Sequence, residues 1–171
     1  MRPTVVYAND AADRRIQISL PIFPRIVAVD EDFRNKLLNK DKVLLVFIYH
    51  SEKDKAERLA ESLRVKLSNV AGLEFKAQAV SVREQLQASA KIPTALFVAE
   101  RFSKQTFDLV LEYSIKQQRI LFSPFAGDVE RGAAAGISIT SRVNPYFNIK
   151  TLQRAAIEIN PVLMKLSKRY E

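Results

Sequence analysis

Apolar and polar residues alternate in blocks along the chain, and the blocks predict strands and helices in turn. Residues 42–50 (KVLLVFIYH) are almost entirely apolar over the length of one strand. Such a run is typical of a strand that is buried on both faces of a largely parallel sheet. Similar apolar segments predict three further strands at 72–80, 92–100 and 119–122.

Helical spacing of apolar residues fills the intervals between these strands. Ser51, with Asp54 three residues later, predicts the start of a first helix. Ser81 and Glu84 form a cleaner capping box for a short helix, and Ser103 predicts a third N-cap. The longer helices each have one apolar face, made by Ala56, Leu59, Ala60, Leu63, Leu67 and Val70 and by Phe107, Val110, Leu111 and Ile115. Strands alternating with helices predict right-handed crossovers in an α/β sheet.

The pattern changes after the fourth strand. Residues 123–136 (SPFAGDVERGAAAG) are rich in small residues and contain three of the four glycines, which predicts a loop. Two alternating stretches follow at 137–143 and 146–150, and Asn144-Pro145 between them predicts the turn of an antiparallel hairpin. The predicted fold class is therefore α/β: a single domain with a mixed, mostly parallel sheet flanked by helices, and a C-terminal antiparallel hairpin.

The two ends of the chain are less regular. Residues 13–38 show apolar residues at helical spacing and also at strand spacing, and we favour a helix. Thr151 predicts the start of a short helix, and residues 157–159 a short strand. Asn160 and Pro161 predict a closing helix, because Asn accepts from free N–H groups and Pro gives up a donor that the first turn does not use. We expect this punctuated segment to be packed against the domain.

Composition limits the available chemistry. The chain has 171 residues, 47% of them hydrophobic, which suffices for one buried core, but it lacks the run of about 20 apolar residues that a membrane span needs. Without cysteine and with His50 as its only histidine, it excludes disulfides, iron–sulfur clusters, thiolate zinc and histidine-rich metal sites. No catalytic triad or phosphate-binding motif is apparent. We expect no metal, no cofactor and no enzymatic activity.

The net charge is +8, from 27 Lys and Arg against 19 Asp and Glu. Such an excess favours an acidic partner, which is nucleic acid, anionic lipid or an acidic protein face. The charge is spread thinly, and clusters such as Arg14-Arg15 lack the interleaved aromatic residues and glycines of a single-strand binder. A solvated basic surface is the simpler interpretation, and no specific nucleic-acid binding is expected.

Candidate binding residues stand where the predicted strands end. His50 and Ser51 follow the first strand, and Ser81, Glu100 and Ser123 stand at the carboxyl ends of the next three. Because open α/β sheets bind ligands beyond these ends, the five residues predict a pocket for a small molecule. For His50 the alternative is a loop histidine with no special partner.

The loop after the fourth strand is a second candidate. Ser123, Gly127, Arg131 and Gly132 lie within it, and its backbone N–H groups are able to cradle an anion. The alternative is a tight connection in which the glycines supply a positive φ or a close backbone approach.

The first residues suggest processing. Residues 1–12 are interpreted as a flexible N-terminus that precedes a domain of residues 13–171. Val6 and Ala8 stand where a signal peptidase requires small residues, but the apolar region of a signal peptide is missing. Either the segment is the trimmed remnant of an exported precursor, or the spacing is a coincidence.

Two segments, ILFSPFAGDVERGAAAGISI and FNIKTLQRAAIEINPVLMKLS, resemble the YfiR-like family of small periplasmic proteins. In that family a strand leads into a Gly-Phe-Ala-x-x-Gly-Gly loop, followed by a Phe-x-Ile-Asn strand, an Ala-rich helix and a Leu-rich closing helix. Residues in step with this pattern are Gly127, Arg131, Gly132, Phe147, Ile149, Ala155, Ala156, Leu163 and Leu166. Ala133 replaces the second loop glycine, and the family's Trp and cysteine pairs are absent. The resemblance covers residues 42–170.

The resemblance implies a non-enzymatic periplasmic regulator with one YfiR-like α/β domain. Members contact the periplasmic sensor part of a membrane-bound diguanylate cyclase or related signalling protein, often as dimers. The implied partner is therefore a membrane signalling protein of cyclase or kinase type, within cyclic-di-GMP signalling, and a homodimer is also implied. A small-molecule, solute-binding-like protein is the main alternative, and a cytosolic protein that binds nucleic acid is the third.

Overall fold

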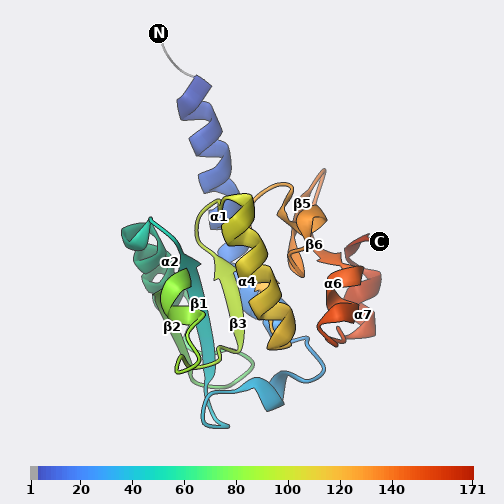
Figure 1. Ribbon diagram of the computed structural model, residues 1–171. Coiled ribbons are helices and arrows are strands. Elements are labelled where there is room, and N and C mark those ends of the chain that lie inside the picture. Colours follow the sequence, from blue (N-terminus) through green and yellow to red (C-terminus); the bar gives the residue numbers. More distant parts are fainter. Residues whose placement is uncertain (1–3) are drawn as a thin grey trace.

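A seven-stranded sheet runs through the computed structural model, which describes residues 4–171 (Figure 1). The strand order is β2-β1-β3-β4-β5-β6-β7. The first five strands in this order are parallel, β6 is antiparallel to β5, and β7 is parallel to β6. The predicted α/β fold with a mixed, mostly parallel sheet is confirmed. The strands are β1 (Val43–Tyr49), β2 (Phe75–Ser81), β3 (Ala95–Val98), β4 (Ile120–Phe122), β5 (Ala135–Ile139), β6 (Val143–Asn148) and β7 (Lys168–Tyr170).

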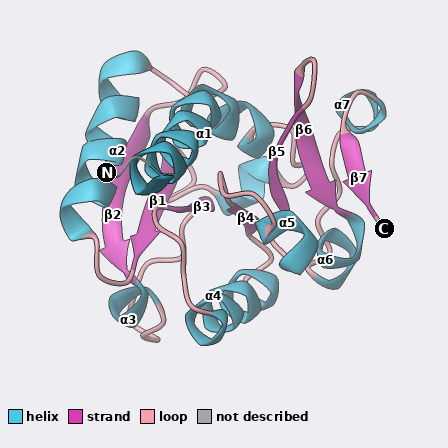
Figure 2. Ribbon diagram, turned by 90° about the horizontal axis from the view of Figure 1, so that it is seen from above, coloured by secondary structure: helices cyan, strands magenta, loops and turns pink. Residues whose placement is uncertain are grey.

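Helices cover both faces of the sheet. Seen from above, α1 and α2 lie on one side of the central strands, and α3 and α4 lie on the other (Figure 2). The ion pair between Arg154 and Glu112, at 2.9 Å, joins α6 to α4. The helices are α1 (Thr4–Val27), α2 (Lys53–Lys66), α3 (Val82–Gln85), α4 (Lys104–Lys116), α5 (Asp128–Arg131), α6 (Ile149–Arg154) and α7 (Pro161–Lys165), with a 3-10 turn η1 (Phe33–Lys36).

A cluster of four phenylalanines fastens α1 to the middle of the sheet. Phe47 of β1 is in register with Phe97 of β3, and Phe97 with Phe122 of β4, so their side chains share one face. Phe23 of α1 packs on all three, with ring centroids 5.3 to 6.1 Å apart. All four are fully buried, and each buried Phe contributes about 1.5–3 kcal/mol. The helix is therefore part of the core.

The structure resolves the ambiguity near the N-terminus in favour of a helix, with different bounds. α1 begins at Thr4 and ends at Val27, instead of spanning residues 13–38. Residues 4–12, which we predicted to be a flexible segment, form the first turns of α1, and residues 1–3 lie outside the described residues. The buried face of the helix carries Ile16, Leu20, Phe23, Ile26 and Val27 at helical spacing.

The hairpin is confirmed, but its turn is not where we predicted it. The turn lies at residues 140–142, where the Thr140 N–H donates to the Arg142 carbonyl at 2.9 Å. Asn144 and Pro145 belong to β6, with Pro145 opposite Ile137 of β5. Pro145 is tolerated there because it precedes the residues of β6 that pair with β7.

The last 25 residues differ most from prediction. Helix α6 begins at Ile149, capped by Asn148, instead of at Thr151. The predicted strand at 157–159 is a single bridge between Ile159 and Asp30. The Asn160 cap is confirmed, since its Oδ1 accepts from the Val162 N–H at 2.9 Å.

The closing helix is shorter and more exposed than expected. α7 ends at Lys165 and has no buried residue, and the segment 168–170 forms β7 at the edge of the sheet. This segment packs against the domain through Leu163 and Met164 of α7, which contact the core while partly exposed, and through pairing of β7 with β6.

Candidate functional site

The order in which the chain adds strands to the sheet reverses between β1 and β3. From β1 the chain crosses to β2 on one side, whereas from β3 it proceeds through β4 and β5 on the other. In open α/β sheets, ligands bind in the crevice at the carboxyl ends of the two strands where the order reverses. The structure brings His50, Ser51 and Glu100 together at this point, as predicted from the strand ends.

The carboxylate of Glu100 lies at the N-terminus of α2. Its Oε1 accepts from the backbone N–H groups of His50, Ser51 and Glu52 at 2.7, 2.8 and 2.9 Å. Its Oε2 accepts from the Ser51 hydroxyl at 3.0 Å. Glu100 is only 5% exposed. The chain's own side chain therefore occupies the place where the free N–H groups of the helix would bind an anion.

The ionisation of Glu100 follows from this geometry. Burial alone would raise the pKa of its carboxyl, but the hydrogen bonds from Glu52, Ser51 and His50 outweigh burial and hold the pKa below its ordinary value. The group is an anion at neutral pH, and the N–H groups around it are satisfied.

Ser51 does not cap α2, contrary to our prediction. The helix begins at Lys53, and its N-cap residue Glu52 makes no side-chain capping bond. Ser51 instead donates its hydroxyl to Glu100, which lies 49 residues away in sequence. His50 contributes its backbone N–H, and its side chain is exposed.

Ser81 lies at the end of β2, opposite Tyr49 of β1. Its hydroxyl accepts from the Glu84 N–H at 3.1 Å, which confirms Ser81 as the N-cap of α3, one of the two bonds of the predicted capping box. The side chain is thus used by its own helix rather than directed at Glu100.

The loop after β4 is held together by its own groups. The Ser123 hydroxyl donates to Asp128 Oδ2 at 2.6 Å, and Arg131 forms an ion pair with Asp128 Oδ1 at 2.9 Å. Burial raises the pKa of Asp128, although the bond from Ser123 and the charge of Arg131 oppose that rise. Loop N–H groups at Asp128, Arg131 and Gly132 donate to loop carbonyls, which favours a tight connection over an anion cradle.

Two glycines allow this loop to turn. Gly127 and Gly132 have φ of 91° and 130°, in the region that favours glycine, and they stand at the two ends of α5. A Cβ at Gly132 would lie 2.6 Å from Cδ2 of Leu111 in α4. Gly132 therefore allows the loop after β4 to approach Leu111 of α4 closely.

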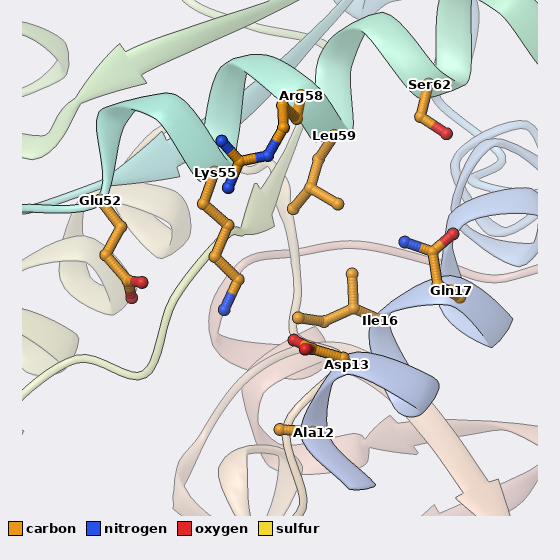
Figure 3. Close-up of a pocket in the computed structure, with 9 residues that line it drawn as sticks. All are labelled: Ala12, Asp13, Ile16, Gln17, Glu52, Lys55, Arg58, Leu59 and Ser62. Atoms are coloured by element: carbon orange, nitrogen blue, oxygen red, sulfur yellow. The ribbon is translucent and has the colours of Figure 1, made fainter. Parts of the chain in front are cut away.

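A groove between α1 and α2, with a volume of about 650 Å³, was not predicted (Figure 3). Ile16 of α1 and Leu59 of α2 point toward each other at its floor, and Lys55 extends from α2 toward α1. Asp13 lies on the α1 wall, and Arg58 lines the α2 wall. The groove is open to solvent and carries charge on both walls.

Cations gather beside this groove at the carboxyl edge of the sheet. The ammonium of Lys55 and the guanidinium of Arg101 lie 5.8 and 5.2 Å from the centre of the buried Phe125 ring. Arg15 donates to the carbonyls of Pro124 and Ile137 at 2.8 and 3.0 Å. Burial and then the charge of Arg101 lower the pKa of Arg15.

Sequence patterns gave little indication that Arg15, Lys55 and Arg101 would lie at the same edge of the sheet. These cations come from α1, α2 and the segment after β3, so they are scattered over nearly 90 residues of sequence. The basic excess was visible, but only the fold brings these particular side chains to one edge.

Metal-binding groups and membrane-spanning helices are both absent from the described residues. Among residues 4–171, no group of three or more His, Cys, Asp or Glu side chains is arranged to hold a metal ion. None of the helices in the same range combines the length and the apolarity that crossing a bilayer requires.

Comparison with known proteins identifies the fold. No protein-family model matches the sequence, and a comparison with curated proteins finds no match either. The solved structures that are similar in fold include the following two. One is the ABC domain in complex with L-Trp from Streptococcus pneumoniae, with a TM-score of 0.53 and 17% identity over 84% of this chain and 61% of that chain.

The other solved structure is a conserved domain protein from Vibrio cholerae O1 biovar eltor. It has a TM-score of 0.56 and 13% identity over 83% of this chain and 60% of that chain. The chain therefore spans about three fifths of the length of both structures. At such identities the likeness extends to the fold alone.

Proposed function

We propose that the protein is a non-enzymatic regulator that binds the sensor part of a membrane signalling protein in the periplasm. The resemblance of residues 42–170 to the YfiR-like family supports the partner class and the location. The partner would be of diguanylate cyclase or kinase type.

One observation in particular carries the proposal: the Glu100 carboxylate fills the switch point of the sheet. A small anionic ligand or substrate at that point would compete with four hydrogen bonds made within the chain. It would also have to displace a carboxylate whose pKa is held low by those bonds. Recognition through the outer surface, by another protein, needs no such displacement.

The polar groups at the other strand ends support the same conclusion. The hydroxyls of Ser51, Ser81 and Ser123 are each engaged with a group of their own chain. A nucleophile needs a neighbouring base in hydrogen-bond reach, and the partners of Ser51 and Ser123 are carboxylates that already serve the fold. These residues are therefore better explained as structural than as catalytic.

A small-molecule binding protein is the second candidate. A solved structure with this fold is described as a complex with L-Trp, and the groove of about 650 Å³ between α1 and α2 falls in the size range of ligand sites. In this case the ligand would bind between the helices, away from Glu100.

The test is to immobilise the purified protein, expose it to detergent-solubilised bacterial membranes, and identify the retained proteins by mass spectrometry. The expected result is a membrane signalling protein whose purified sensor domain binds directly in calorimetry. Amino acids, including L-Trp, are titrated in parallel and should give no heat. Saturable binding of an amino acid without any membrane signalling protein would replace the proposal with the second candidate.

A further inference from the structure

Three cations at the carboxyl edge of the sheet lack a carboxylate partner. Lys55, Arg58 and Arg101 have no carboxylate oxygen within 4.0 Å in the part of the chain that the structure describes. The contrast with other cations of α2 is direct, since Lys53 pairs with Glu57 and Arg64 with Glu61. The charge beside the groove is therefore uncompensated by ion pairs, although two other cations of the same helix, Lys53 and Arg64, are paired.

Two of these side chains lie near the same aromatic ring. Lys55 Nζ and Arg101 Cζ are 5.8 and 5.2 Å from the centre of the Phe125 ring, and Arg101 also donates to the Ala126 carbonyl at 3.1 Å. Like charges near one ring repel each other, and an anion bound beside either cation would reduce that repulsion. The geometry favours a carboxylate from outside the chain.

The groove beside these cations is elongated. Its α2 wall extends from Glu52 to Ser62, which is about 15 Å at 1.5 Å per residue, and its α1 wall from Ala12 to Gln17. The floor between the walls is apolar, formed by Ile16 and Leu59. The α2 wall is long enough to contact about three turns of a third helix.

The walls differ in charge. Lys55 and Arg58 project from the α2 wall, whereas Asp13 lies on the α1 wall and Glu52 at one end (Figure 3). An occupant with acidic residues toward α2, and none toward α1, is complementary to this arrangement. The polarity of the groove therefore fixes the orientation as well as the charge of what binds.

We infer that the α1–α2 groove is the docking surface for an acidic amphipathic helix of a partner protein, whose carboxylates pair with Lys55 and Arg58. This inference rests on the proposed function, which it deepens by naming the surface and the chemistry of the partner. Association should be fast and should slow as salt rises, because opposite charges steer the encounter.

The test uses a synthetic stapled helical peptide with Leu on one face and Glu along one flank. A second peptide carries Lys in place of each Glu. Binding to the full chain is measured by fluorescence anisotropy. Lys55→Glu with Arg58→Glu should weaken binding of the acidic peptide about tenfold, since two attractive contacts become repulsive.

The matched control is Lys76→Glu with Lys150→Glu, which changes the net charge equally at exposed positions outside the groove. It should leave the affinity within about twofold, because distant surface charges are screened. Asp13→Asn should tighten the acidic peptide by about twofold, because it removes a repulsive charge from the opposite wall. This gain does not depend on how well the double variants fold.

Several results would overturn the inference. They are equal affinity for the two peptides, equal losses in the two double variants, weaker binding by Asp13→Asn, or displacement of the peptide by a short DNA duplex. If the Lys55/Arg58 variant captures the membrane partner as well as wild type does, the docking groove is wrong and the proposed function stands. If the wild type binds the acidic peptide but captures no signalling protein, the reverse holds.

Discussion

The carboxyl edge of the sheet contains two charged regions that are built in opposite ways. At the switch point, the carboxylate of Glu100 is buried and receives four hydrogen bonds. In the adjacent groove, Lys55 and Arg58 face solvent on a wall without ion-pair partners among the described residues. The first region is complete within the chain, whereas the proposed partner helix would complete the second. The site that suits ligands by its place in the fold is therefore closed, and the open charge lies farther along the same helix, α2.

The strongest test of the closed region is Glu100→Ala. The change removes an ionised acceptor and leaves the N–H groups of His50, Ser51 and Glu52 without their partner, so we expect a loss of about 3 kcal/mol in unfolding free energy. The measurement is the midpoint of urea denaturation. A loss below about 1 kcal/mol would mean that water replaces the carboxylate easily and that the region is not closed.

A second substitution tests whether the loop after β4 is also a structural element rather than a binding surface. Gly132→Val should destabilise by about 1–3 kcal/mol, because Gly132 has a φ of 130° and a side chain there would meet Leu111. Leu111→Ala in the same background separates the two causes, since it removes the contact but not the strain. Wild-type stability with altered partner binding would show instead that the loop is a recognition surface.

The contributions of Glu100 and Asp128 to the unfolding free energy should change with pH in opposite directions. The pKa of Glu100 is lowered in the folded state, so its stabilisation is present above the pKa of the unfolded chain, about 4.3, and is lost as pH falls through the folded pKa. The stability difference between wild type and Glu100→Gln should therefore shrink from pH 6 to pH 3.

Asp128 should behave in the opposite way. Its pKa is raised by burial, so the folded state is favoured below the unfolded pKa of about 3.9, and that advantage is lost as pH rises through the folded pKa. Asp128→Asn should therefore gain relative to wild type as pH rises. The same sign for both acids in the urea midpoints would contradict the assignment of their environments.

The smallest effects are expected in the open region. Lys55→Ala and Arg58→Ala should each change the unfolding free energy by no more than about 0.5 kcal/mol, because neither side chain has an ion pair to lose. Thermal melts at low and moderate salt would detect either a loss or a small gain. Destabilisation comparable to that of Glu100→Ala would show that these cations serve the fold and would erase the contrast between the two regions.

Sequence patterns predicted the parts of the fold that depend on local order. The buried strand β1 was evident because its residues are apolar without interruption. The caps at Ser81 and Asn160 were evident because the cap side chain and the N–H group that donates to it lie close in sequence. The turn of the hairpin was misplaced because Asn144-Pro145 has turn chemistry, although the pairing of β5 with β6 places it within a strand.

Sequence patterns predicted the part of the candidate site that consists of residues at the carboxyl ends of strands. His50, Ser51 and Glu100 do meet, but the role of Ser51 was missed because a carboxylate 49 residues away binds its hydroxyl in place of a helix cap. The α1–α2 groove was missed because Asp13 of α1 and Lys55 of α2 share no local pattern. Both failures concern contacts between residues that are distant in sequence, which neither periodicity nor capping rules describe.

The position of Phe23 in the aromatic cluster also has a consequence for biogenesis. Phe23 packs against Phe47, Phe97 and Phe122, so the first helix completes its buried face only after the fourth strand has been made. At about 5–20 residues per second, synthesis from Phe23 to Phe122 takes about 5–20 s. During that interval α1 is able to bury its apolar stripe only in part, so the native core is completed late in synthesis.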